Sequence, residues 1–115
     1  MGRVIMRHGS DKLKAEFLPK IVRGELEFCI GYSERDAGSD LAALQCSAED
    51  WGDDFVLNGH KMWNSAHQTD WMWTAVRTDP EAPKHKGISI LLVDLKLPGI
   101  EIVAQPLIDG SRKNI

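Results

Sequence analysis

The sequence predicts a mainly β fold: a small antiparallel β-barrel of about seven strands, preceded by one short amphipathic helix. Three patterns lead to this interpretation. Apolar residues recur every four positions in an early segment, which is the period of one helix face. Later, short runs of apolar and aromatic residues are separated by turn residues, as in β proteins. An Asn-Gly pair between two of these runs favours a tight hairpin.

The helix is expected over residues 11–23. Its apolar positions share one face: Leu13, Phe17 and Ile21. Ser10 can cap the first turn and Gly24 can end the last one. Pro19 lacks a backbone N–H, so we expect a break after Leu18 or a second short turn that begins at the proline. The apolar face then needs a cover from the rest of the chain.

Seven strands should follow this helix, over residues 26–32, 44–51, 54–57, 60–64, 71–78, 88–95 and 100–104. Asn58-Gly59 suits the two positive-φ positions of a type I′ turn. The strands around it should therefore form a hairpin that brings Trp63 back beside Trp51. Trp71 and Trp73 alternate along one strand, so at least one of them should pack inward.

Two polar segments interrupt or follow the strands. Residues 79–87 carry two prolines and should form an exposed loop. Residues 109–115 have little to hold them in place, and we expect a mobile tail there.

Composition limits the class of protein. A chain of 115 residues with 43% hydrophobic residues suits one domain with a modest core. The net charge of −3 gives no broad positive surface for nucleic acid or an anionic membrane. Cys29 and Cys46 fit no zinc or redox spacing, and Cys29 lies in an apolar run typical of a buried thiol. No apolar stretch approaches the roughly 20 residues that span a bilayer, and no signal peptide is evident. A reducing, cytoplasmic location fits best.

The segment from Ile30 to Asp40 has the composition of a binding site. Ser33 and Ser39 offer hydroxyls, and Gly38 lets a ligand approach the backbone closely. Successive backbone amides in such a turn can hold phosphate. An ordinary polar loop after a strand is the competing interpretation. For the carboxylates of Glu34 and Asp40 we expect hydrogen bonds to backbone amides rather than acid–base catalysis.

A second polar segment, residues 57–66, follows the first. The order Y-S-E-x-x-A-G-S-D, then N-G-x-K-x-W-x-S, then the strand that ends Ala75-Val-Arg-Thr-Asp79, resembles the central domain of the acyl-CoA dehydrogenases. The resemblance covers nearly the whole chain, with residues 1–25 similar to the end of that family's first helical domain and residues 26–108 to its central barrel. The chain departs from the family in having Tyr32-Ser33 and Arg35-Asp36 where an aliphatic residue, Thr and Pro-Gly are usual. Asn64-Ser65 replaces the usual Ile-Thr, and both serines keep a hydroxyl.

The resemblance implies FAD as the cofactor. The matching positions are Ile30, Tyr32, Ser33, Gly38, Ser39, Trp63, Asn64 and Ser65. In the family, the ring at Trp63 lies against the isoalloxazine, the hydroxyl at Ser65 lies near the flavin N5 and O4 edge, and Ser33 lies near the pyrimidine side. Ser39 matches a contact with the cofactor phosphates and the acyl-CoA substrate. The alternatives are a core tryptophan at Trp63 and a surface serine at Ser65.

The resemblance also implies a reaction, α,β-desaturation of an acyl-CoA thioester with hydride transfer to flavin N5. The family's catalytic base is a glutamate in a C-terminal helical domain with no counterpart in this sequence, so no residue is nominated as catalytic. We expect weak flavin binding and no turnover from the chain alone. The implied partners are acyl-CoA, an electron-transfer flavoprotein or other acceptor, and further subunits in a homo- or hetero-oligomer. Alternatives are a non-catalytic truncated subunit or structural partner, an acyl-CoA oxidase-type flavoenzyme, and a generic β-barrel binding module.

Overall fold

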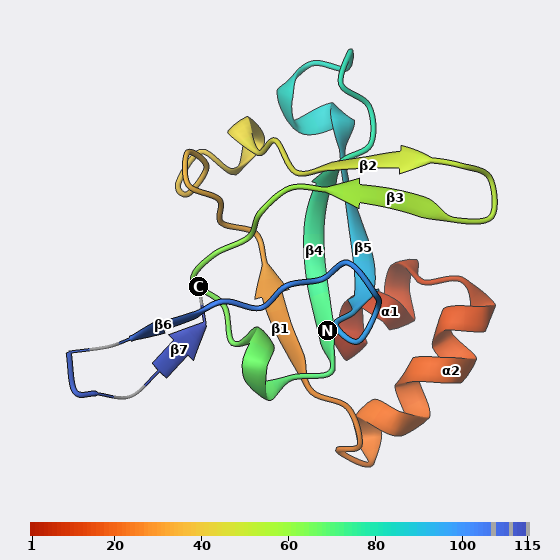
Figure 1. Ribbon diagram of the computed structural model, residues 1–115. Helices are drawn as coiled ribbons and strands as arrows, with labels where there is room; N and C mark the ends of the chain where they lie inside the picture. Colours follow the sequence, from red (N-terminus) through yellow and green to blue (C-terminus); the bar gives the residue numbers. More distant parts are fainter. Residues whose placement is uncertain (107, 111, 115) are drawn as a thin grey trace.

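The computed structural model describes residues 1–106, 108–110 and 112–114 (Figure 1). Its helices and strands are, in chain order, α1 (Gly2–His8), α2 (Asp11–Val22), β1 (Phe28–Gly31), β2 (Ser47–Asp50), β3 (Phe55–Asn58), β4 (Trp71–Arg77), β5 (Ile88–Asp94), β6 (Ala104–Pro106) and β7 (Arg112–Asn114). Three short 3-10 turns connect them: η1 (Leu41–Ala43), η2 (Ala66–Gln68) and η3 (Lys84–Gly87).

The main sheet is organised around β4. This strand pairs parallel with β1 along four residues, antiparallel with β5 along its whole length, and parallel with the start of β2 at its own end. The β2–β3 hairpin therefore crosses one end of β4 (Figure 1). The result is an open, mixed sheet of five strands, with β6 and β7 in a separate ribbon.

The predicted closed antiparallel barrel is therefore wrong. The sheet does not close, because β1 and β3 end the path of paired strands at its two sides. Two of the pairings with β4 are parallel. Apolar alternation along a strand identifies its two faces but gives neither its partner nor its direction.

The hairpin expected at Asn58-Gly59 is not formed. Asn58 is the last residue of β3 and pairs with Ser47. Gly59 has φ +155° and lies so close to Cys46 that an added Cβ would come within 2.6 Å of the cysteine Cα. The glycine is needed here for close packing rather than for a turn. The chain then continues to η2 instead of returning, so Trp63 is not brought back beside Trp51.

The real hairpin turn lies between β2 and β3, over residues 51–54. The Trp51 N–H donates to the carbonyl of Asp54 at 2.9 Å, and Gly52 takes φ +90°. Asp50 Oδ1 accepts from the Gly52 N–H at 2.8 Å. Four strands were expected after this hairpin. Two of them form as β4 and β5, residues 60–64 form none, and only Ala104 of residues 100–104 lies in a strand.

Helix α2 confirms most of the expected helix. Ser10 caps it, accepting a hydrogen bond from the Leu13 N–H at 3.2 Å. At the other end Gly24 has φ +69° and donates to Ile21, while Glu25 donates back to Lys20, the arrangement of a Schellman motif. The break expected at Pro19 is wrong, because the exposed proline lies inside a continuous helix. α1, whose Ile5 is buried, was not predicted.

The core lies along β4. Met72, Ala75 and Val76 are buried and each belongs to a different apolar cluster. Phe17 of α2 is 3% exposed and packs edge-on against Trp71, with ring centroids 4.9 Å apart. This contact gives the helix face the cover it needs.

Three further expectations concern Cys29, the tail at residues 109–115 and the limits of the domains. Cys29 is buried within the Met72 cluster, as expected of a structural thiol. Within the expected mobile tail, residues 112–114 pair with β6, and positions 111 and 115 lie outside the described residues. The mobility of residues 109–115 and the domain limits at residues 25 and 108 stay predictions.

Candidate functional site

The two polar segments picked out in the sequence meet at the end of β1. The Met62 N–H donates to the carbonyl oxygen of Ser33 at 3.0 Å. Lys61 Nζ donates to the carbonyl oxygen of Tyr32 at 3.3 Å. We call residues 32–34 and 61–62 the junction. It fixes the start of one segment against the middle of the other.

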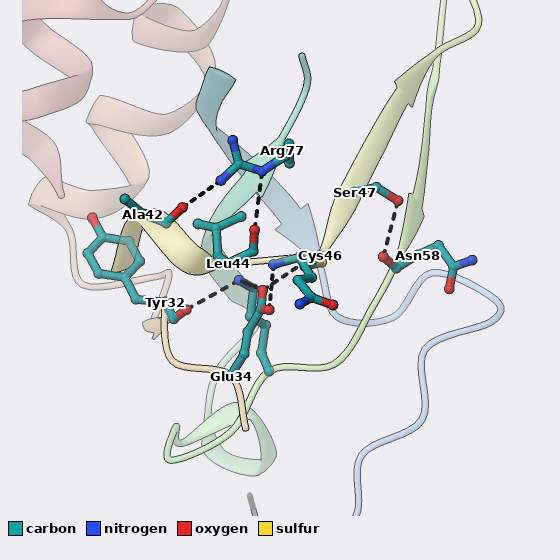
Figure 2. A network of polar contacts seen from close by, with 10 residues as sticks. Tyr32, Glu34, Ala42, Leu44, Cys46, Ser47, Asn58 and Arg77 are labelled. Carbon is teal, nitrogen blue, oxygen red and sulfur yellow. Dashed lines mark hydrogen bonds and ion pairs between the residues drawn. The ribbon is translucent and has the colours of Figure 1, made fainter. Parts of the chain in front are cut away.

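A buried ion pair lies at the centre of the junction. Glu34 Oε1 accepts from Lys61 Nζ at 2.6 Å and from the Cys46 N–H at 3.0 Å, and Oε2 accepts from the Gln45 N–H at 2.7 Å (Figure 2). The side chains of Glu34 and Lys61 are only 10% and 6% exposed. The expectation that Glu34 binds backbone amides is therefore confirmed. Asp40, in contrast, is exposed and pairs with Lys84 at 4.0 Å.

The surroundings of the ion pair shift two pKa values. Burial raises the pKa of Glu34, but hydrogen bonds from Lys61, Gln45 and Cys46, together with the lysine charge, outweigh it and hold the pKa below its usual 4.5. Burial raises the pKa of the Cys46 thiol above 9.0, helped by the Glu34 charge and opposed by the Lys61 charge. At neutral pH the carboxylate is therefore ionised, whereas the thiol is protonated and a poor nucleophile.

A tight turn links the junction to the glycine and serine of the first segment. Glu34 and Ala37 exchange two backbone hydrogen bonds, at 2.8 and 3.3 Å. Gly38 and Ser39 follow on the surface. A Cβ added to Gly38 would meet no atom within 4 Å, so space is open for a ligand to approach this backbone.

Trp63 is exposed and has an unusual backbone conformation. Its φ is +60°, in the left-handed region that side chains other than glycine rarely adopt, and it is 69% exposed. This exposure excludes the core tryptophan that was the alternative interpretation. Asn64 Oδ1 accepts from the Ala66 N–H at 3.1 Å and fixes the chain just after it. Such outliers persist where surrounding contacts enforce them, and they gather at functional sites.

The remaining predicted residues lie around this centre. Ile30 is 52% exposed on β1, and the Tyr32 hydroxyl accepts from Trp73 Nε1 at 3.0 Å. Ser65 is exposed at the start of η2. The junction joins the segment that carries residues 30–33 to the segment that carries residues 63–65, through bonds made by Lys61 and Met62. Between the described residues, no hydrogen bond joins Ser39 to residues 63–65. Along the chain, the Glu34–Ala37 turn lies between the junction and Ser39.

Two cations of the site were not identified from the sequence. One is Lys61. The other is Arg77, whose guanidinium donates to the carbonyls of Ala42, Leu44 and Lys84 at 2.7, 3.2 and 2.9 Å. Figure 2 shows the segment from Ala42 to Cys46 held between Arg77 and Glu34. In the sequence, the signal for Arg77 was a cation at the end of an apolar strand. The signal for Lys61 was a cation shortly before a tryptophan.

Two hollows of about 210 and 410 Å³ flank the junction. Lys61 and Asn64 line the first, and Glu34 and Arg35 line the second. Trp63 and Ser39 lie outside both. The chain therefore presents these two residues on open surface.

Residues 1–106, 108–110 and 112–114 contain neither a metal centre nor a membrane-spanning helix. There, no three His, Cys, Asp or Glu side chains come together in a way that could hold a metal ion. In the same residues, no helix combines the length and the apolar character needed to cross a membrane.

The open mixed sheet and the two motifs that it joins match a known family of domains. Residues 29–114 match the family model of the acyl-CoA dehydrogenase middle domain. The chain belongs to the acyl-CoA dehydrogenase family and corresponds to its middle domain, which confirms the resemblance seen in the sequence.

Individual relatives support this assignment. Acyl-CoA dehydrogenase FadE29 of Mycobacterium tuberculosis is 48% identical over 112 residues, which are 96% of this chain and 29% of that protein. The solved Tcur3481-Tcur3483 steroid ACAD is 42% identical with a TM-score of 0.93, covering 98% of this chain and 30% of that one. The ChsE4-ChsE5 complex of Mycobacterium tuberculosis gives 45% identity and a TM-score of 0.89, covering 98% and 29%. The chain therefore spans less than a third of the length of these relatives.

Proposed function

We propose that this chain contacts FAD and acyl-CoA within an acyl-CoA dehydrogenase that desaturates an acyl-CoA thioester between its α and β carbons. The observation that carries the proposal is the junction. It bonds Lys61 and Met62, the residues just before the exposed Trp63, to Tyr32 and Ser33 of a separate segment of the chain. A solved glutaryl-CoA dehydrogenase of Mycobacterium smegmatis, 30% identical with a TM-score of 0.76, contains FADH2.

The residues present fit a flavin. The indole of Trp63 offers an exposed apolar face for a flat ring system. Ser65 offers a hydroxyl two residues away, and Ser33 offers a second one across the junction. FAD, when bound, would supply the acceptor for the hydride that leaves the substrate. The chain's own part is to orient the ring through Trp63 and to place donors at its polar edge.

The cofactor phosphates and the acyl-CoA substrate are proposed to lie beyond the Glu34–Ala37 turn, at Gly38 and Ser39. Gly38 leaves open space above the backbone, and Ser39 adds an exposed hydroxyl. These two residues would bind the cofactor phosphates and the acyl-CoA. The likeness to a protein described as a steroid ACAD favours a bulky acyl group as substrate.

The catalytic base and the rest of the FAD site would come from other parts of the whole enzyme. Two of the solved relatives are described as pairs of proteins, Tcur3481-Tcur3483 and ChsE4-ChsE5. We therefore infer a hetero-oligomer in which further polypeptide completes the site. An electron-transfer flavoprotein or another acceptor would reoxidise the flavin. The chain alone would bind FAD weakly and show no turnover.

The test is titration of the purified chain with FAD, followed through flavin absorbance and tryptophan fluorescence. Saturable quenching that Trp63→Ala abolishes is the expected result. Trp51→Ala is the matched control, because Trp51 is also 69% exposed but lies in the β2–β3 turn. Equal affinity in the wild-type chain and Trp63→Ala would contradict the proposed role of the indole.

A further inference from the structure

Two stretches of chain converge on the carboxylate of Glu34 at the junction. Glu34 accepts hydrogen bonds from Gln45 and Cys46 at the entry to β2 and from Lys61 in the second segment. Lys61 also binds the carbonyl of Tyr32. Both oxygens of the carboxylate are occupied, and the ammonium has two acceptors.

This arrangement is costly if its only role is stability. Removing two charges from water carries a penalty that apolar side chains of similar size avoid. A pair of leucine-like residues could fill the same volume. It could not hold the Tyr32 carbonyl or the amides of Gln45 and Cys46 at fixed distances. The ion pair therefore contributes geometry that packing alone would not.

The geometry reaches Trp63 through a short path. Lys61 is held by Glu34, and the next residue, Met62, is held by Ser33. Trp63 follows directly with φ +60°. Its strained conformation needs an anchor on each side, and Asn64 provides the second one through Ala66. Loss of the first anchor would let Trp63 relax and swing its ring away.

We propose that Glu34 and Lys61 are positioning residues of the flavin site, which set the place of Trp63 and Ser65 relative to Tyr32 and Ser33 without touching the flavin themselves. This inference rests on the proposed function for its ligand. The part of the inference that does not depend on FAD is the coupling of the ion pair to Met62 and Trp63, and it is tested separately.

The variants are Glu34→Gln, Lys61→Met and the double substitution, made in this chain. Glu25→Gln is the control, because it breaks an ion pair with Arg23 on the exposed end of α2. Hydrogen exchange at the Met62 amide is compared with exchange at the β4 amides, and FAD affinity is measured by titration. We expect Met62 exchange to rise about tenfold relative to β4 in both single variants, and FAD affinity to fall by about the same factor. Glu25→Gln should change neither.

The double substitution separates positioning from stability. Lys61→Met alone leaves a buried carboxylate without its partner, and the neutral double variant relieves that cost. The double variant should therefore unfold at a higher denaturant concentration than Lys61→Met. It still lacks the bond to Tyr32, so fast Met62 exchange and weak FAD binding should persist. Recovery of FAD affinity together with stability would overturn the positioning role.

Two further results separate this inference from the proposed function. If Met62 and β4 exchange rise equally in the variants, the ion pair is only structural and the inference fails, even where FAD binds the wild-type chain. If the wild-type chain binds no FAD while Met62 exchange rises selectively, the proposed function fails in this chain and the coupling of the ion pair to Met62 is supported.

Discussion

The indole N–H of Trp73 donates a hydrogen bond to the hydroxyl of Tyr32 at 3.0 Å. Trp73 lies in the central strand, and Tyr32 lies where β1 ends and the candidate site begins. The tyrosine ring also packs against the buried cluster of Ala37, Leu44 and Ala75. The first segment of the site is thus tied to β4 by a side chain as well as by the sheet.

Tyr32→Phe should lower the free energy of unfolding by about 1 kcal/mol, because it leaves the half-buried Trp73 N–H without its acceptor. Urea unfolding followed by circular dichroism measures the change. An unchanged midpoint would show that water replaces the hydroxyl at no cost.

Trp63→Gly should be more stable than Trp63→Ala by about 1 kcal/mol, because only glycine adopts a positive φ without a steric cost. Denaturant unfolding of the two variants gives the difference directly. Trp51 has no positive φ, so the order should reverse for Trp51→Gly and Trp51→Ala. The same order at both positions would refute strain at Trp63.

The stability contributed by Glu34 should depend on pH with a defined sign. Its pKa is lowered by folding, so the ionised form is bound more favourably in the folded state. The contribution is complete above pH 4.5, the unfolded value, and is lost as the pH falls through the lower folded value. Unfolding of wild type and Glu34→Gln from pH 7 to pH 3 should show a gap that narrows below pH 4.5. A gap that widens on acidification would contradict this sign.

Gly59→Ala should destabilise the chain by about 1–3 kcal/mol, because its Cβ would meet the Cys46 backbone at 2.6 Å. Gly38→Ala is the matched control, since nothing lies within 4 Å of its added Cβ. The control should keep its stability within about 0.5 kcal/mol. It should instead weaken FAD binding, because the methyl group occupies the space left for the ligand. Equal destabilisation of the two variants would count against the close approach at Gly59.

Local signals in the sequence were sufficient for the features that depend on neighbouring residues. Ser10, the four-residue period and Gly24 define α2 within a single segment, and the structure agrees. The Glu34 bonds to backbone amides were also expected, because a carboxylate in a turn commonly accepts them. The strands at β1, β4 and β5 were found in about the right places.

Features that depend on distant residues were not accessible in the same way. Alternation along β1 could not show that it pairs parallel with β4. In the sequence, Asn58-Gly59 has the pattern of a turn. Only the structure shows that Gly59 is packed against Cys46, which is distant in the sequence. Arg77 gave no sign of its three carbonyl acceptors, because their distance from it in the sequence follows no local period. The open sheet, and the roles of Lys61 and Arg77, depend on such distant residues and could not be predicted from local patterns.

The place of β4 in the chain also bears on how the domain folds. Every other strand of the main sheet pairs with β4 directly or through β2, yet β4 begins only at Trp71. During synthesis, β1, β2 and β3 therefore emerge before the strand that organises them. The β2–β3 hairpin can form from neighbouring residues alone before β4 emerges, whereas β1 and β2 must close longer loops to pair in parallel with β4. Until β4 arrives, residues that pack against it in the finished fold, such as Cys29 and Ala48, are exposed to wrong partners, and a chaperone would be most useful in this period.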